Sequence, residues 1–345
     1  MKQLMMILMC ALCALSCRRV PLYETDGNVY VQIKVDLSVD IEVDPDIDIF
    51  SNPLYTEKLF GKMPEYVQLC FYSTETHELV KEDFVTVEGG AIDIPSGTYD
   101  LIVYSLGHET TSLSSNKMRG SLYAYSQDVT TSKSYLLDKI LATLKGNNVT
   151  TQEDINMAYG DDPIIAEPEH LYVGVKENIV IPDVKSNDKA TTIVIPIDIK
   201  SIVETYCFEI RNIVGAKNIY SVDVFITGHV GRRYLWGGRY WNQPCTLFFN
   251  ATTDAEKGHI YTIFNTFGKY PGADNEVILN LLIYDSDGGQ YEFVYDVTDQ
   301  FDDPDNTNHE IIIDEQIIIP ESGSSGSGFD PSVAPWDEED EKIQL

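Results

Sequence analysis

The sequence predicts a mainly β chain that folds as two antiparallel β-sandwich blocks with one or two short helices. Apolar and polar residues alternate over Val29–Val43, which is the period of a strand with one buried face. From residue 171 to residue 320, short apolar runs recur between turn residues, a pattern typical of β-sandwiches. After residue 160 the sequence has almost no helical periodicity.

The first block comprises residues 29–170. After the alternating strand, a second strand is predicted at Tyr66–Ser73, and Gly89-Gly90 predicts a hairpin turn between two shorter strands. Ile94–Ser105 carries apolar residues on both faces and is therefore expected to be a central strand. The one clear helix signal is the leucine-rich stripe of Ser132–Leu144.

The second block comprises residues 171–320, and its apolar runs predict a series of short strands. These are expected at Thr191–Ile199, Tyr206–Ile210, Ile219–Thr227, Cys245–Asn250, Tyr261–Phe267, Val277–Tyr284, Tyr291–Val297 and Glu310–Ile319. Residues 321–345 then form a Gly/Ser linker followed by an acidic end. Ile343 and Leu345 would point to one face, which predicts a terminal strand.

The N-terminus predicts export and a lipid anchor. Residues 1–16 combine one lysine, a short apolar run and small residues before Cys17, as a secretory signal does. Ala14 and Ser16 before the cysteine are similar to a bacterial lipobox, in which Cys17 would carry the lipid, such as palmitate. Residues 17–28 would then be the lipidated N-terminus and spacer. An ordinary cleaved signal, with Cys17 near the new N-terminus by accident, is the alternative.

The charge and the cysteines narrow the class of protein. A net charge of −31 argues against a nucleic-acid partner, because phosphate binding needs a cationic surface, and against lying flat on an anionic membrane. Cys70, Cys207 and Cys245 lie too far apart in sequence for a zinc knuckle. They are expected to be buried, inert thiols, although a disulfide between two of them is left open.

No enzyme signature is present, and no cofactor or metal is predicted. The sequence lacks the motifs of serine hydrolases, zinc proteases and P-loop proteins, and its six histidines are scattered. Asp285-Ser-Asp287-Gly288-Gly289 starts like a calcium loop but lacks the later oxygen ligands, so a hairpin turn is the preferred interpretation. The acidic run Asp299–Asp305 is interpreted as a solvated loop.

One cluster in this acidic chain has the composition of a binding site. Three arginines lie among four aromatic residues in a predicted hairpin: Arg232, Arg233, Tyr234, Trp236, Arg239, Tyr240 and Trp241. Tyr, Trp and Arg dominate binding hot spots, and flat aromatic faces stack on sugars. Arginines stacked on aromatic rings also stabilise ordinary hairpins, so a structural role is the alternative.

A second hypothesis concerns strand exchange. An extended segment can complete a sheet that lacks a strand, with main-chain hydrogen bonds and alternate side chains filling pockets. Two segments could move in this way: Val29–Val43, and the terminal segment with Val333, Trp336, Ile343 and Leu345. The terminal segment is the preferred donor, because its flexible linker allows either exchange or docking on its own chain.

Several features together resemble the fimbrillin-associated anchor lipoproteins of Bacteroidales, which are FimB-like subunits of type V fimbriae. They are the lipobox cysteine followed by Arg-Arg-Val-Pro-Leu-Tyr-Glu, the alternating first strand, the Pro-Ser-Gly-Thr-Tyr-Asp-Leu-Ile-Val-Tyr segment, Tyr291–Gln300, and the terminal Trp336 with its Ile-x-Leu end. The resemblance implies two tandem transthyretin-like β-sandwich domains, fimbrial subunits as partners, and assembly by strand exchange.

The expected function is therefore that of a non-enzymatic, lipid-anchored fimbrial anchor or adhesin subunit. A carbohydrate-binding surface lipoprotein that uses the hairpin of residues 232–241 is the alternative. The expected location is the outer membrane. Arg18-Arg19 stand where surface lipoproteins of this group often carry acidic residues, so the cell surface and the periplasmic face both remain open.

Overall fold

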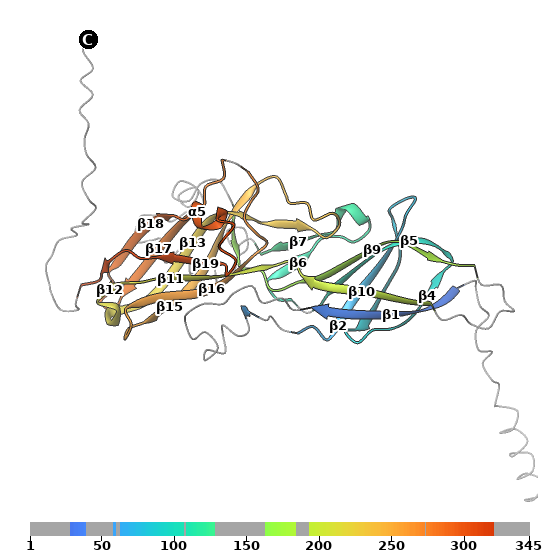
Figure 1. The fold of residues 1–345 in the computed structure, drawn as a ribbon, viewed down its shortest axis with the longest axis horizontal. Helices are drawn as coiled ribbons and strands as arrows, with labels where there is room; N and C mark the ends of the chain where they lie inside the picture. The colour runs from blue at the N-terminus through green and yellow to red at the C-terminus, as the bar shows by residue number, and fades with distance from the viewer. Residues whose placement is uncertain are drawn as a thin grey trace, which may run out of the picture.

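The computed structural model describes residues 28–38, 58–59, 63–106, 108–127, 163–183, 193–272 and 274–320. Two β bodies lie end to end and give the molecule an elongated shape (Figure 1). The chain is mainly β, and its curled sheets have a β-sandwich fold. Several sequence predictions lie outside the described residues: the signal, Cys17 with its spacer up to residue 27, residues 39–43 of the first strand, the helix at Ser132–Leu144, and the segment 321–345.

The first body is a seven-stranded sheet with the order β3-β2-β5-β9-β10-β1-β4. Its strands are β1 (Asn28–Ser38), β2 (Tyr66–Ser73), β3 (Leu79–Thr86), β4 (Gly90–Pro95), β5 (Gly97–Ser105), β9 (Tyr172–Ile181) and β10 (Ile193–Ser201). The alternation predicted for β1 is confirmed as far as Ser38, because Val29, Val31, Ile33 and Val35 are all buried in one core. β5 is a central strand, as its two apolar faces predict.

This sheet curls because its middle strands separate. β9 and β10 pair only at Tyr172–Val173 with Lys200–Ser201, whereas β9 pairs with β5 along its length and β10 pairs with β1. The sheet therefore divides into the layers β3-β2-β5-β9 and β10-β1-β4, which face each other across the core. At the opposite side, the turn at Gly89 joins β3 to β4. A side chain does not fit at Gly89, because its Cβ would lie 2.2 Å from the carbonyl oxygen of Ile33.

The chain passes from the first sheet to the second later than residue 170. β9 and β10 lie after that residue in the sequence, yet both belong to the seven-stranded sheet. The next strand, β11, begins at Glu204 and belongs to the second sheet. Non-local pairing of this kind leaves no local signal in the sequence. The division of the chain into two folding domains stays a prediction, because strand pairing alone does not define folding units.

The second body is a sheet with the order β18-β17-β13-β15-β16-β11-β19. Its strands are β11 (Glu204–Ile210), β13 (Ile219–Val230), β15 (Pro244–Asp254), β16 (His259–Thr266), β17 (Ile278–Asp285), β18 (Gln290–Asp296) and β19 (Glu310–Ile313). β15 pairs with β13 up to Ala251 and with β16 only from Thr252 onward. The change of partner folds this sheet into two layers around a second core.

Smaller elements complete the second body. They are β12 (Ile213–Val214), β20 (Ile317–Ile318), the five-residue helix α5 (Thr298–Asp302) and the 3-10 turn η3 (Ala216–Asn218). The predicted single strand at Glu310–Ile319 is wrong in one respect, since β19 pairs with β11 whereas β20 forms a separate two-stranded sheet with β12. The three residues between β19 and β20, 314–316, are not in a strand.

A third sheet joins the two bodies. It has the order β14-β7-β6 and combines β6 (Thr111–Leu113) and β7 (Tyr123–Ser126), which flank the 3-10 turn η1 (Arg119–Ser121), with β14 (Arg232–Tyr234) from the second half of the chain. Conversely, β8 (Ile164–Ala166) from the first half of the chain pairs in parallel with β15 of the second body. Each half of the chain thus adds a strand to a sheet of the other half. A third apolar core, with Tyr72, Tyr104, Leu235 and Phe267, fills the space between them.

Candidate functional site

The predicted aromatic and basic hairpin is confirmed, and it lies at the junction of the two bodies. The backbone N–H of Tyr234 donates to the carbonyl of Arg239 (2.8 Å), and that of Trp241 donates to the carbonyl of Arg232 (3.1 Å). Gly237 and Gly238 form its tip with φ of 73° and 59°, a conformation that glycine adopts without steric cost.

Strand pairing places the hairpin against a strand that is distant in sequence. Arg232 lies opposite Tyr125 of β7, and Tyr234 lies opposite Tyr123. Because alternate residues of a strand point to the same face, these four side chains share one face of the three-stranded sheet. Leu235 and Ala124 belong to the opposite, buried side and contribute to the third core.

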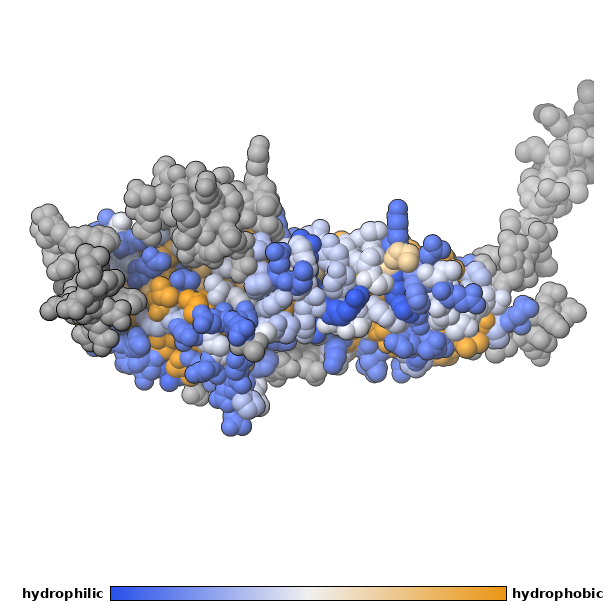
Figure 2. All heavy atoms as spheres, turned by 90° about the horizontal axis from the view of Figure 1, so that it is seen from above, coloured by the Kyte–Doolittle hydropathy of each residue, from blue (hydrophilic) through white to orange (hydrophobic). Residues whose placement is uncertain are grey.

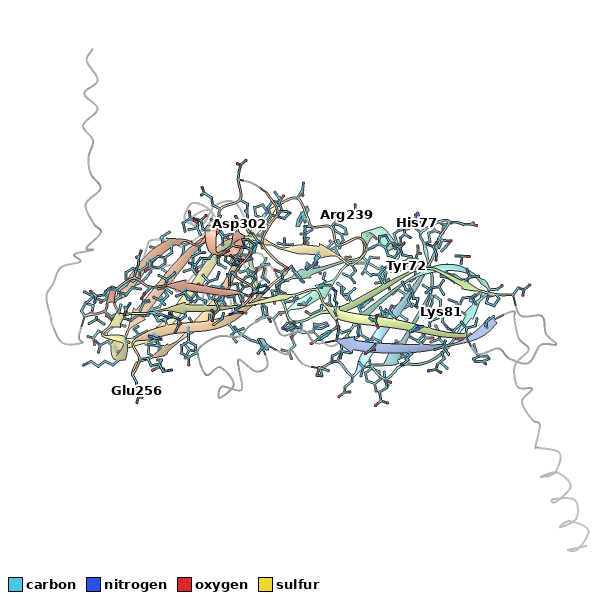
Figure 3. All side chains as sticks on the ribbon, in the orientation of Figure 1. Tyr72, His77, Lys81, Arg239, Glu256 and Asp302 are labelled. Atoms are coloured by element: carbon cyan, nitrogen blue, oxygen red, sulfur yellow. The ribbon has the colours of Figure 1, made fainter. Side chains whose placement is uncertain are left out.

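The shared face forms a cluster of rings and guanidinium groups, which we call the platform. The ring centroids of Tyr123 and Tyr234 are 5.3 Å apart, and those of Tyr123 and Tyr125 are 5.8 Å apart. The guanidinium carbon of Arg232 lies 3.1 Å from the ring centroid of Trp241, and that of Arg239 lies 5.1 Å from the centroid of Tyr234. The platform comprises Tyr123, Tyr125, Arg232, Tyr234, Arg239 and Trp241. Figure 3 shows the labelled Arg239 at the surface between the two β bodies.

Trp236 takes part in a different arrangement. The guanidinium carbon of Arg119 lies 3.9 Å from its ring centroid, and Arg119 also forms an ion pair with the buried carboxylate of Asp100. Asp100 in turn accepts a hydrogen bond of 3.0 Å from the backbone N–H of Asn178. Trp236 itself packs against the third core. Its ring therefore covers a partly buried ion pair and contributes to the junction.

Arg233 and Tyr240 also stand apart from the platform. The Arg233 guanidinium donates a hydrogen bond of 2.6 Å to the carbonyl of Ile202, and it lies 5.5 Å from the ring centroid of Tyr240. Ile202 follows β10 directly in sequence. Arg233 thus connects the hairpin to the segment that links the two large sheets, and this contact satisfies its charge in part without any ligand.

A cavity of about 690 Å³ adjoins the platform at the end where Arg232 and Trp241 lie. Polar and aromatic side chains line much of this cavity, namely those of Glu109, Ser112, Tyr125, Gln127, Arg232, Trp241 and Gln243. Its floor includes Ile165 of β8 and the buried Cys245 of β15. The volume falls within the range of about 300–1,000 Å³ that is usual for small-molecule sites.

Arg232 differs from the other arginines near the junction in its bonding. Arg119 pairs with Asp100, Arg233 donates to Ile202, and Arg239 donates a hydrogen bond of 3.4 Å to the carbonyl of Gly120. Within the described residues Arg232 has ring contacts with Trp241 and Tyr123 but no hydrogen bond or ion pair. Its N–H donors therefore remain available at the wall of the cavity.

The sequence identified the hairpin but missed half of the site. Tyr123 and Tyr125 lie more than a hundred residues before Arg232, and only their Tyr-Ala-Tyr spacing hints at a common face. Ser112, Gln127 and Gln243 carry no signal that would separate them from other surface residues. Cys17, Val333, Trp336, Ile343 and Leu345 lie outside the described residues, and their proposed roles stay predictions.

The turn at Asp285 and the possible metal ligands are the other candidate groups in the sequence. Asp285 accepts hydrogen bonds from the backbone N–H groups of Asp287 and Gly289 (2.9 and 2.6 Å), and it also accepts one from the Tyr291 hydroxyl. In the part of the chain that the structure describes, no three His, Cys, Asp or Glu side chains gather as they would around a metal ion.

The three described cysteines are buried, and the surface visible in Figure 2 is mostly hydrophilic. Cys70, Cys207 and Cys245 are buried, as predicted, and burial raises the pKa of the Cys207 thiol to about 12. Across the described ranges, no helix is both long and apolar enough to cross a lipid bilayer. Figure 2 shows hydrophilic side chains over most of the visible face, with apolar side chains in a few small groups.

Comparison with known proteins gives a family and a fold. The sequence family described as a domain of unknown function (DUF5119) matches residues 57–250, which is more than half of the chain. No curated protein matches the sequence.

Among solved structures, a candidate adhesin from Bacteroides ovatus is similar with a TM-score of 0.55 and 17% identity, over 88% of this chain and 98% of that one. The fimbrial anchor protein Mfa2 from Porphyromonas gingivalis gives a TM-score of 0.47 and 8% identity, over 84% and 90% of the two chains. The first of these shows that the chain shares the adhesin's fold, and at such identities a shared fold does not establish a shared function.

Proposed function

The chain belongs to the DUF5119 family, and from that premise we propose that it is a non-enzymatic, lipid-anchored subunit of a fimbrial or adhesive assembly. The observation that carries the proposal is the fold shared with the Bacteroides ovatus candidate adhesin across 88% of this chain. The lipobox-like N-terminus ending at Cys17 adds an anchor, and the transthyretin-like class of each sandwich is part of the same proposal.

We further propose that the subunit binds its neighbours by β-strand complementation. The first strand supports this mechanism, because β1 lies between β10 and β4 and inserts Val29, Val31, Ile33 and Val35 into the first core. Alternate apolar side chains filling successive pockets are the recognition mode of an added strand. The terminal segment with Val333, Trp336, Ile343 and Leu345 is the proposed donor to a neighbouring subunit.

The donor role is tested with full-length chains that differ only near the C-terminus. Ile343→Asp combined with Leu345→Asp should abolish co-purification with the fimbrial subunit of the same organism, because charged side chains cannot enter apolar pockets. Gln344→Asp is the matched control, since its side chain points to the other face of an extended strand. Deletion of residues 322–345 should have the same effect as the double variant. If the double variant and the deletion both retain the complex, the donor role is refuted.

The lipid anchor is tested separately. Cys17→Ser removes the thiol that would carry the lipid, so the variant should lose incorporation of labelled palmitate and leave the membrane fraction. Cys70→Ser, which changes a buried thiol, should keep both properties. A Cys17→Ser chain that remains labelled and membrane-bound would favour the alternative of an ordinary signal.

A carbohydrate-binding role for the hairpin is the second candidate. The platform and its cavity favour it, because Tyr125 and Trp241 offer aromatic faces beside polar side chains that can bond to hydroxyl groups. A glycan array with the full chain distinguishes the two functions. Trp241→Ala should remove any retained glycan, whereas complex formation with a fimbrial subunit should not change.

A further inference from the structure

We propose that the cavity beside the platform binds a carboxylate-bearing sugar, such as a uronic acid residue of an acidic polysaccharide, with Arg232 as the group that bonds to the carboxylate. The proposal rests on the carbohydrate-binding candidate described above. It adds the chemical class of the sugar and the residue that selects it.

The first argument is the state of Arg232. Its guanidinium stacks on Trp241 at 3.1 Å, which fixes its plane and leaves its N–H edges without a hydrogen bond or ion pair among the described residues. A stacked guanidinium with free edges matches a carboxylate, because two parallel N–H···O bonds can form in its plane. Tyr123 holds the same group at 5.7 Å from its ring centroid.

The second argument is the charge of the chain. With 55 acidic and 24 basic side chains, this protein has more than two carboxylates for each cation. Arg119, Arg211, Lys58 and Lys269 all form ion pairs in the structure. Arg232 lines the cavity and has no such partner among the described residues, so its charge can pair with that of a ligand.

The third argument is the remaining wall of the cavity. Tyr125 offers a ring to the apolar face of a sugar, and Ser112, Gln127 and Gln243 add hydroxyl and amide groups near it. One carboxylate, that of the exposed Glu109, also lines the cavity and can accept hydrogen bonds from sugar hydroxyls. Aromatic and amide groups of this kind favour a sugar acid over the carboxylate of a peptide terminus.

The test compares two ligands that differ only in their carboxylates. Isothermal titration of the full chain with tetragalacturonate should give binding, and the fully methyl-esterified tetragalacturonate should bind about tenfold more weakly or worse, because an ester cannot form the charge-assisted pair. Arg232→Lys keeps the positive charge but loses the planar fork, and it should weaken tetragalacturonate binding by about tenfold.

Arg211→Lys is the matched control. Arg211 follows β11 and pairs with Glu209 (2.7 Å), and it belongs neither to the platform nor to the lining of the cavity. This variant should bind tetragalacturonate as the wild type does, and near-ultraviolet circular dichroism should show that both variants keep the native fold.

The inference would be overturned by absence of binding to any uronic acid oligosaccharide on a glycan array. Equal affinity for the acid and its methyl ester would also overturn it, as would unchanged affinity in the folded Arg232→Lys variant. Binding of a peptide with a free C-terminus in place of the sugar acids would also refute it. Binding of neutral sugars alone would leave the carbohydrate-binding function intact and reject only this specificity.

Discussion

At the scale of single residues, the hairpin contains two tryptophans with different surroundings. Trp236 covers the Arg119–Asp100 ion pair and packs against the third core, whereas Trp241 carries Arg232 at the wall of the cavity. A buried ion pair depends on every group that shields and orients it, because an incompletely compensated charge in the interior is costly.

Trp236→Ala is therefore expected to destabilise the fold. The free energy of unfolding should fall by about 2 kcal/mol, from lost apolar burial and a lost cation–π contact. Trp241→Ala should change it by less than about 1 kcal/mol, because its ring is stacked at a partly exposed surface. Chemical denaturation of the two variants measures both values. Equal losses would mean that both rings have the same structural role.

His229 gives the fold a dependence on pH. Its ring is fully buried, its Nδ1 lies 2.9 Å from Oγ1 of Thr266, and burial lowers its pKa from 6.5 to about 3. The unfolded chain therefore binds a proton below pH 6.5 that the folded chain does not bind. The resulting contribution to stability is fully present above pH 6.5 and is lost as the pH falls toward 3.

His229→Phe removes this titration while keeping an aromatic ring beside Phe264 and Phe301. Between pH 6 and pH 4, the wild type should lose about 1.4 kcal/mol of unfolding free energy per pH unit more than the variant. Denaturation at a series of pH values gives the two slopes. Parallel slopes would show that His229 does not contribute. His108 and His170, whose pKa values burial also lowers, are present in both chains.

At the scale of elements, the edge of β19 is covered by side chains that act like a neighbouring strand. The Gln300 amide accepts from the N–H of Ile312 (2.8 Å) and donates to its carbonyl (3.0 Å). Asn306 makes the same two bonds with Glu310, at 3.0 and 2.9 Å. Unpaired strand edges promote association between chains, and natural sheets protect them in various ways.

Gln300→Ala should expose this edge. We expect a loss of about 1–3 kcal/mol in unfolding free energy, since two backbone groups lose their partner, and a concentration-dependent dimer on size-exclusion chromatography. Asp299→Ala, which changes an exposed neighbour, is the control and should remain monomeric to the same degree as the wild type. A monomeric and equally stable Gln300→Ala chain would contradict the role of the amide.

At the scale of the whole molecule, the two bodies share strands and a core. β14 adds to β7 of the first half, β8 adds to β15 of the second, and the third core includes residues of both halves. Elements that complete each other's sheets cannot separate without exposing backbone hydrogen-bonding groups. A chain joined in this way can transmit a pulling force along its length, which the proposed role in an anchored assembly would require.

Wild-type protein should therefore unfold in a single calorimetric transition with equal calorimetric and van't Hoff enthalpies. Leu235 is buried in the third core, so Leu235→Asp should separate this transition into two. Val80→Asp changes a side chain that is 46% exposed on β3 and should leave one transition. Two transitions in the wild type would show that the bodies unfold independently.

The candidate site shows where prediction from sequence stops. The hairpin of residues 232–241 was evident because its signal is local, a pair of glycines between arginines and aromatic residues. Its partner strand was not, because the register of Arg232 with Tyr125 joins residues more than a hundred positions apart. The assignment of Trp236 to a structural position and of Trp241 to the cavity wall likewise depends on which neighbours face each ring.

By itself, the sequence determined the β class, most strand positions, the buried thiols and the acidic surface, because alternation, turn residues and charge act over short distances. The tertiary structure alone decided that β9 and β10 complete the first sheet, that the halves exchange β8 and β14, and that Arg232 lines a cavity. The physical reason is that sheet pairing is set by contacts between distant segments, and a strand's sequence shows which face is buried without showing what it is buried against.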